Sequence, residues 1–104
     1  MARPYSQKFL LDLYRNNSTS LGVNLARLCV NANLPATYVA AALETTRTTV
    51  YSWFRGQGIR EGKHNLIKTF IELVEEDMAN GVLPAKTVLD AKRYIEQMIG
   101  SPIK

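Results

Sequence analysis

The sequence predicts an all-α fold: a five-helix bundle in which two short central helices are joined by a tight turn and the last two helices form an antiparallel hairpin. Apolar residues recur at intervals of three and four along most of the 104 residues, which is the spacing of helices with one buried face. Serine, threonine or proline precedes most of these segments, and glycine or asparagine follows several of them, as at helix ends. No stretch alternates apolar and polar residues for long enough to predict a strand.

The composition predicts a single domain over residues 1–104, with N-terminal helices at 1–62 and the hairpin at 63–104. A chain of 104 residues with 46% apolar content can build one small core. Cys29 is the lone cysteine and is expected to be a buried, small apolar residue. No apolar run approaches the ~18 residues that span a bilayer, and the N-terminus lacks the apolar core of a signal peptide. We therefore expect a cytoplasmic protein with no membrane partner.

Two helices are expected before residue 33. Ser6 can cap the first helix, and the polar run at 15–20 is predicted to be a loop. The second helix is expected at 21–32. Pro35 can open a third helix, because the first helical position has no amide to lose. The apolar stripes of the first and second helices are Phe9, Leu10 and Leu13, then Leu21, Leu25, Leu28 and Cys29.

The segment from Val39 to Gly56 predicts two short helices joined by a polar turn, a helix-turn-helix. Thr46 can cap the second of these helices by accepting a hydrogen bond from an amide of its first turn. Ala40 is small where the two helices would cross closely. Each helix has an apolar stripe, formed by Val39, Ala40 and Leu43 in the first and by Val50, Trp53 and Phe54 in the second.

The second helix of this pair is expected to present a polar face to a ligand. That face is opposite Val50 and Trp53, and its side chains can donate hydrogen bonds to phosphates or to base edges. Tyr51 follows Val50 by one position, so we expect it to turn away from the core and to contact DNA. The residues of this face are Arg47, Thr48, Tyr51, Ser52 and Arg55.

Residues Ala42 to Gly56 fit the pattern A-L-x-x-[ST]-R-x-T-V-x-x-W-x-R-G, which resembles the helix-turn-helix of lambda-repressor-like and Cro-like regulators. The resemblance extends from about Leu25 to Gly56. It implies that the second helix lies in the major groove of double-stranded DNA while the first crosses the backbone. It also implies groove contacts by Thr46, Arg47, Thr48, Tyr51 and Ser52, with Arg55 nearer the phosphates and secondary backbone contacts by Thr37, Arg60 and Lys63.

The chain departs from this family at two places. Glu44 stands where the family has a glycine whose φ is positive, and a residue with a side chain costs about 1 kcal/mol there. Its carboxylate would also lie close to DNA. Thr37 and Thr46 stand where the better-known repressors use two glutamines to grip a phosphate, so base preference does not transfer to this chain.

The charge distribution also favours a nucleic-acid partner. The net charge is +4, and residues 1–65 carry eight basic and three acidic side chains, while residues 66–104 carry five and six. The part that contains the helix-turn-helix is therefore the basic part, as neutralising phosphates requires.

A linker at 59–63 precedes the last two predicted helices. The first of them has apolar residues at three-to-four spacing from Leu66 to Met78, and Asn80-Gly81 can form its left-handed cap. Pro84 is expected to start the last helix. We expect this hairpin to join copies of the chain into a homodimer or higher homo-oligomer through residues 64–99. The residues expected to face inward from the last helix are Val88, Leu89, Ile95, Met98 and Ile99.

The sequence does not favour an enzyme. His64 and Cys29 lie far apart on different predicted helices, which leaves neither a Cys-His nucleophile nor a metal site with sensible spacing. The acidic run at 75–77 is expected to be a solvated face, because adjacent helical positions point in different directions. We expect no cofactor, no metal and no small-molecule ligand.

Three functions stay open at this stage. The first is a small repressor-like transcription regulator of phage type, acting in the cytoplasm or nucleoid of a bacterial host. The second is a phage DNA-packaging subunit similar to the small subunit of a terminase, which would assemble as a ring. The third, suggested by Glu44, is an adaptor that binds protein instead of DNA. A dimer would favour the first function, and a ring of eight or more subunits the second.

Overall fold

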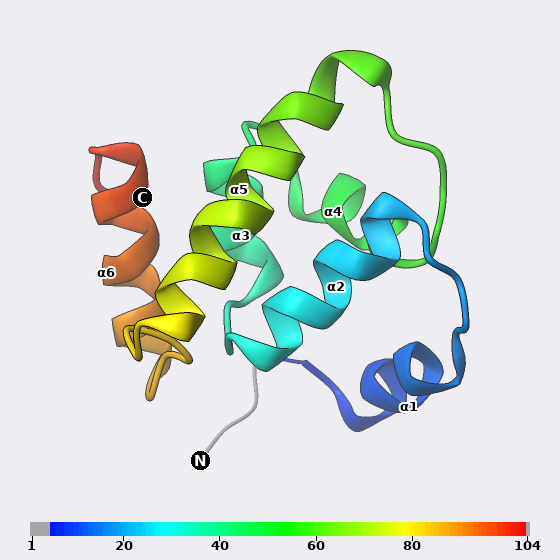
Figure 1. Ribbon diagram of the computed structural model, residues 1–104, viewed down its shortest axis with the longest axis horizontal. Helices are drawn as coiled ribbons and strands as arrows, with labels where there is room; N and C mark the ends of the chain where they lie inside the picture. The colour runs from blue at the N-terminus through cyan, green and yellow to red at the C-terminus, as the bar shows by residue number, and fades with distance from the viewer. Residues whose placement is uncertain (1–4, 104) are drawn as a thin grey trace.

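The computed structural model describes residues 5–103, which form six helices and no strand (Figure 1). The predicted all-α class is confirmed. The predicted number of five helices is wrong: the described residues form six, two ahead of the helix-turn-helix, two within it and two after it. The helices are α1 (Gln7–Arg15), α2 (Leu21–Asn31), α3 (Ala36–Ala42), α4 (Arg47–Phe54), α5 (Glu61–Ala79) and α6 (Val88–Ile99).

Hydroxyl side chains fix the starts of four helices. The Ser6 and Thr46 caps are predicted from the sequence and are confirmed, with Oγ atoms accepting from the amides of Phe9 and Thr49. Ser20 and Thr87 cap α2 and α6 in the same way. Each cap satisfies one of the amides that a helix leaves without a partner at its N-terminus. Pro35 lies at the cap position of α3, one residue before the position that the sequence predicts.

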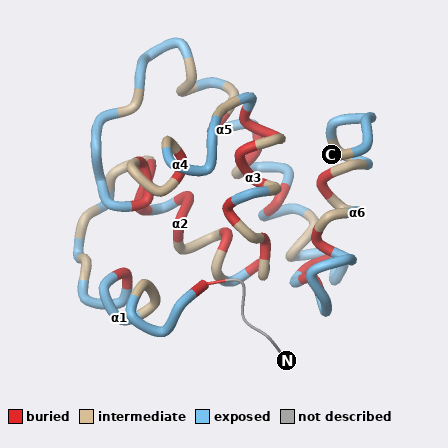
Figure 2. Tube along the Cα trace, turned by 180° about the vertical axis from the view of Figure 1, so that it is seen from behind, coloured by how far each residue is buried: buried red, intermediate tan, exposed pale blue. Residues whose placement is uncertain are grey.

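The core lies where α2 to α6 face one another (Figure 2). Cys29 is fully buried, as predicted, and burial raises the pKa of its thiol well above the ordinary value. Trp53 is also a core residue, as predicted. The core side chains include Val23, Leu25, Ala26, Leu34, Val39, Leu43, Val50, Phe54, Ile67, Phe70, Val74, Ala91 and Ile95.

Helices α2 and α4 are in close backbone contact at Gly22. A Cβ atom on Gly22 would lie 2.1 Å from the carbonyl oxygen of Trp53 and 2.7 Å from its carbonyl carbon. The sequence predicts a different close crossing, between the two helices of the helix-turn-helix at Ala40, and Ala40 is buried. The position that tolerates no side chain is Gly22, because the neighbouring atoms there belong to backbone.

The two C-terminal helices run in roughly opposite directions, but they do not form a hairpin packed on itself (Figure 1). Helix α5 packs mainly on α2, and α6 packs mainly on α3. A hydrogen bond from the Tyr94 hydroxyl to Asp77 Oδ2, 2.5 Å long, links them. Each helix thus completes the core through a different part of the N-terminal half.

Helix α6 begins at Val88 rather than at Pro84, and its inward face differs from the prediction. Ala91 and Ile95, four residues apart, form the buried stripe. Val88, Leu89 and Ile99 are 45%, 53% and 36% exposed, so their predicted inward orientation is wrong. Alanine is only weakly apolar, so Ala91 could not be recognised from the sequence as part of the buried side of α6.

The loop before α6 is anchored on the turn between α2 and α3. The Ala85 amide donates to the Ala32 carbonyl at 3.0 Å, and the side-chain amide of Asn33 donates to the Ala85 carbonyl at 2.7 Å. Asn33 has a φ of +59°, a left-handed conformation that asparagine adopts more readily than most residues. This turn therefore both ends α2 and holds the C-terminal part of the chain.

None of the helices within residues 5–103 combines the length and the apolar character needed to cross a membrane.

The close approach at Gly22 yields a stability prediction. We expect Gly22→Ala to lower the free energy of unfolding by about 3 kcal/mol, because α2 and α4 must separate to admit a methyl group. Urea denaturation followed by circular dichroism measures this change. Gly58→Ala is the control, since a Cβ there meets nothing within 4 Å. Equal stability of the two variants would show that the two helices separate at no cost.

Candidate nucleic-acid interface

The turn between α3 and α4 places the two helices of the candidate site. Glu44 has a φ of +56°, so the left-handed conformation expected at this position is present with a glutamate in place of glycine. The Thr45 amide donates to the Ala40 carbonyl at 3.0 Å, which closes the turn onto the end of α3. A non-glycine residue in this region costs about 1 kcal/mol. The rest of the structure must therefore hold the turn in place.

Lys63, in the first turn of α5, lies against this turn. Its Nζ donates to the carbonyl oxygens of Leu43, at 2.8 Å, and Glu44, at 3.1 Å. The sequence predicts Lys63 as a secondary contact to the DNA backbone. In the structure, its ammonium group is instead hydrogen-bonded to the two carbonyls that directly follow α3.

Thr46 uses its hydroxyl inside the protein. Its Oγ1 accepts from the Thr49 amide at 3.2 Å and donates to Thr49 Oγ1 at 3.0 Å. A threonine hydroxyl has one donor and two acceptor positions, so this arrangement leaves Thr46 one acceptor and no donor. An acceptor suits a base amino group or a water molecule better than a phosphate.

The outer face of α4 is polar and accessible. Helical residues follow one another at about 100° around the axis, so Thr48, Ser52 and Arg55 lie opposite the three buried side chains of α4. Thr48 and Arg55 are exposed, and Ser52 is half-buried. Arg47, the first residue of α4, is exposed beside them. The structure thus leaves four of the predicted contact residues accessible or half-buried along α4 or directly after it, and we call this set the α4 face: Arg47, Thr48, Ser52 and Arg55.

Tyr51 does not turn away from the core, so the predicted orientation is wrong. Its ring packs edge-on against Phe9, with centroids 5.6 Å apart, and against Phe54, with centroids 5.8 Å apart. Tyr51 and Phe54 are three residues apart and share one side of α4. Helix α1 covers that side, and its position cannot be read from the periodicity of α4.

The aromatic side chains that support α4 were not identified from the sequence as part of the site. Tyr5 stacks on Phe9, with centroids 5.1 Å apart, and lies 6.2 Å from Phe54. The Tyr5 hydroxyl donates to the Leu34 carbonyl at 2.5 Å. Burial raises the pKa of Tyr5 well above its ordinary value, which keeps the hydroxyl a donor. The signal available in the sequence was the four-residue spacing of Tyr5 and Phe9.

Thr37 and Arg60 are accessible on the two neighbouring elements. Thr37 is exposed in the first turn of α3, and Arg60 is exposed immediately before α5. Both therefore keep the accessibility that a contact to a DNA backbone requires.

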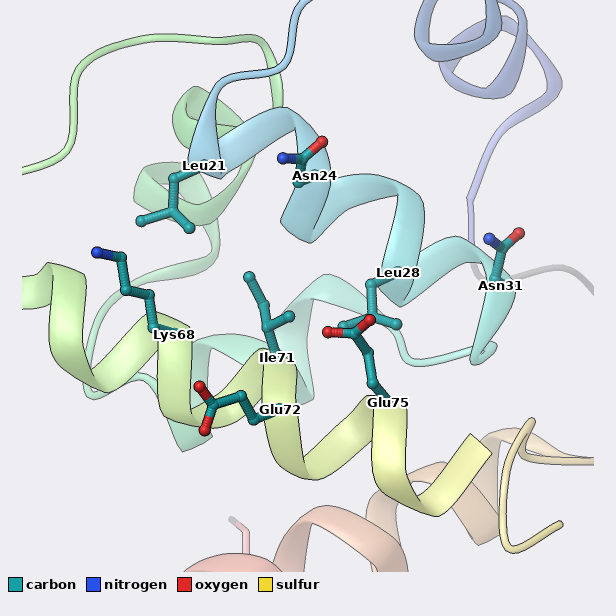
Figure 3. Close-up of a pocket in the computed structure, with 8 residues that line it drawn as sticks. All are labelled: Leu21, Asn24, Leu28, Asn31, Lys68, Ile71, Glu72 and Glu75. Atoms are coloured by element: carbon teal, nitrogen blue, oxygen red, sulfur yellow. The ribbon is translucent and has the colours of Figure 1, made fainter. Parts of the chain in front are cut away.

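A separate groove of about 510 Å³ lies between α2 and α5 (Figure 3). Leu28 and Ile71 point into it from opposite helices, and Lys68 and Glu75 stand at its sides. The groove contains none of the predicted contact residues. Within residues 5–103, the structure brings no three His, Cys, Asp or Glu side chains together in a way that could hold a metal ion.

Comparison of this chain with protein-family models, with curated protein sequences and with solved structures finds no match. The functional interpretation therefore depends on the residues and geometry of α3, α4 and the turn between them.

The strained turn yields a second stability prediction. We expect Glu44→Gly to raise the free energy of unfolding by about 1 kcal/mol, because glycine adopts a positive φ without steric cost. Glu44→Ala is the matched control: it removes the same carboxylate but keeps the Cβ atom. Urea denaturation of both variants separates the two effects. An equal gain in both would assign the effect to charge rather than to backbone strain.

Proposed function

We propose that this chain binds double-stranded DNA by placing α4 in the major groove, as a small repressor-like transcription regulator of phage type. The observation that carries the proposal is the polar α4 face, opposite a side of the same helix that is fully built into the core. The major groove is about 12 Å wide and admits one α-helix. Helix α4 is short, its buried side is packed in the core, and its exposed side carries hydrogen-bond donors, so it suits that groove.

The roles within the α4 face follow from side-chain chemistry. Arg47 lies at the N-terminus of α4, the end that reaches base edges in helix-turn-helix proteins. Its guanidinium can pair with the O6 and N7 atoms of a guanine. Arg55, just after the end of α4, is exposed, and we assign it a phosphate contact. Thr48 and Ser52 can donate to either kind of group.

The charge of the chain supports an electrostatic contribution to binding. The net charge is +4, and the excess of basic side chains lies in residues 1–65. Binding would release counterions from the phosphates, which makes the affinity fall with salt concentration.

We further propose that a second copy of the chain packs against the outer side of α5 and α6, within residues 64–99. Four apolar side chains are exposed on these two helices: Leu73, Val88, Leu89 and Ile99. A symmetric dimer would present two α4 helices, and two-fold symmetric helix-turn-helix proteins place such helices about one DNA turn, ~34 Å, apart.

Arg55→Ala tests the DNA-binding proposal. We expect the slope of the logarithm of affinity against the logarithm of salt concentration to become shallower by about 0.9, the effect of one lost phosphate contact. Fluorescence anisotropy with a mixed-sequence duplex at several salt concentrations measures the slope. Lys8→Ala removes the same charge from the exposed side of α1, outside the α4 face and residues 64–99, and is expected to leave the slope unchanged. If the unmodified chain failed to bind the duplex at low salt, an adaptor would become the better interpretation.

Leu89→Lys tests the self-association proposal. We expect it to convert a dimer into a monomer in size exclusion with light scattering, because it places a charge on the most exposed of the four apolar side chains that we propose to meet the second copy. Leu11→Lys is the matched control, since Leu11 on α1 is 48% exposed and lies outside this surface. A monomeric unmodified chain would contradict the proposal, and a ring of eight or more subunits would favour DNA packaging.

A further inference from the structure

We propose that Lys63 is a positioning residue of the DNA-binding site, which fixes the direction of α4 from behind the turn and contacts no phosphate. The inference rests on the proposed DNA-binding function. It assigns Lys63 a role different from the secondary backbone contact that the sequence predicts.

Two hydrogen bonds carry the inference. The Nζ atom of Lys63 lies 2.8 Å from the carbonyl oxygen of Leu43 and 3.1 Å from that of Glu44. These carbonyls follow the last residues of α3, where the helix dipole concentrates negative charge. An ammonium group satisfies both carbonyls and complements that charge. Lys63 is half-buried, as expected for a side chain held against the protein.

The start of α5, which carries Lys63, is itself held in place by hydrogen bonds and by burial. His64 Nε2 hydrogen-bonds with the Ile59 carbonyl at 2.9 Å, and the Lys63 amide donates to the Arg60 carbonyl at 2.9 Å. Farther along α5, Ile67 and Phe70 are buried in the core. The start of α5 therefore has a defined position, from which a single side chain reaches a turn 19 and 20 residues earlier.

The turn needs such support because its backbone is strained. Glu44 has a φ of +56°, and α4 begins three residues later at Arg47. A rotation of the backbone at Glu44 would therefore change the direction in which the N-terminus of α4 points. Without the ammonium group, the unfavourable conformation of Glu44 and two free carbonyls would both promote that rotation.

A positioning role and a phosphate contact have different signatures in salt titrations. A phosphate contact releases a counterion, so its loss makes the slope of log affinity against log salt shallower by about 0.9. Loss of a positioning residue lowers the affinity by the same factor at every salt concentration, because the number of phosphate contacts does not change. A residue that only stabilises the fold changes neither quantity while the variant stays folded.

The experiment is a salt titration of Lys63→Met with a mixed-sequence duplex, with the folded fraction of the full chain checked by circular dichroism. We expect an affinity loss of about tenfold or more, the effect of a lost charge-assisted hydrogen bond, with an unchanged slope. Lys8→Met is the control: it removes an exposed lysine from α1, outside both the α4 face and residues 64–99, and is expected to change the affinity little. A shallower slope for Lys63→Met, or an unchanged affinity, would overturn the proposal.

A second measurement tests the support of the turn without DNA. We expect Lys63→Met to lower the melting temperature more in the unmodified chain than in the Glu44→Gly background, because glycine holds the turn without strain. Equal losses in both backgrounds would overturn the coupling between Lys63 and the turn. If the coupling is present but the unmodified chain does not bind the duplex, the proposed function fails while the structural role of Lys63 stands.

Discussion

The close contact between α2 and α4 is the constraint on which the rest of the structure depends. Gly22 lets the backbone of α2 reach the Trp53 carbonyl, and no side chain fits between them. This contact brings Val23, Val50 and Phe54 into one core, so the inner side of α4 is fixed before any ligand is present. Only the opposite side of α4 is left free for recognition.

The direction of α4 depends on two further supports at its ends. The strained turn at Glu44, held by Lys63, sets where the helix begins, and Thr46 caps its first turn. Tyr51 and Phe54 in its second half pack on Phe9 of α1. A preorganised helix loses little conformational entropy when it binds, which improves affinity. This rigidity is the physical basis of the proposed DNA binding.

Local signals in the sequence predicted the helices well. Apolar spacing indicated α1 to α5 near their observed bounds, because each stripe depends on residues three or four positions apart. The caps by Ser6 and Thr46 could be predicted for the same reason, whereas the positive φ at Glu44 was expected from the resemblance to a helix-turn-helix turn. The prediction of the last helix was less accurate. Ala91 gave a weak apolar signal for the buried side of α6. The loop before α6 is held by a hydrogen bond from Asn33 to Ala85, which are 52 residues apart.

The sequence by itself determined that the chain is helical, where most helices begin and end, and that the outer side of α4 is polar. The tertiary structure alone decided that Tyr51 packs on α1, that Lys63 supports the turn, and that α2 and α4 are in close backbone contact at Gly22. The physical reason is the range of the interactions. Periodicity and capping join residues within one helical turn. These contacts join residues 19 to 42 positions apart, and whether such residues meet depends on how whole helices pack.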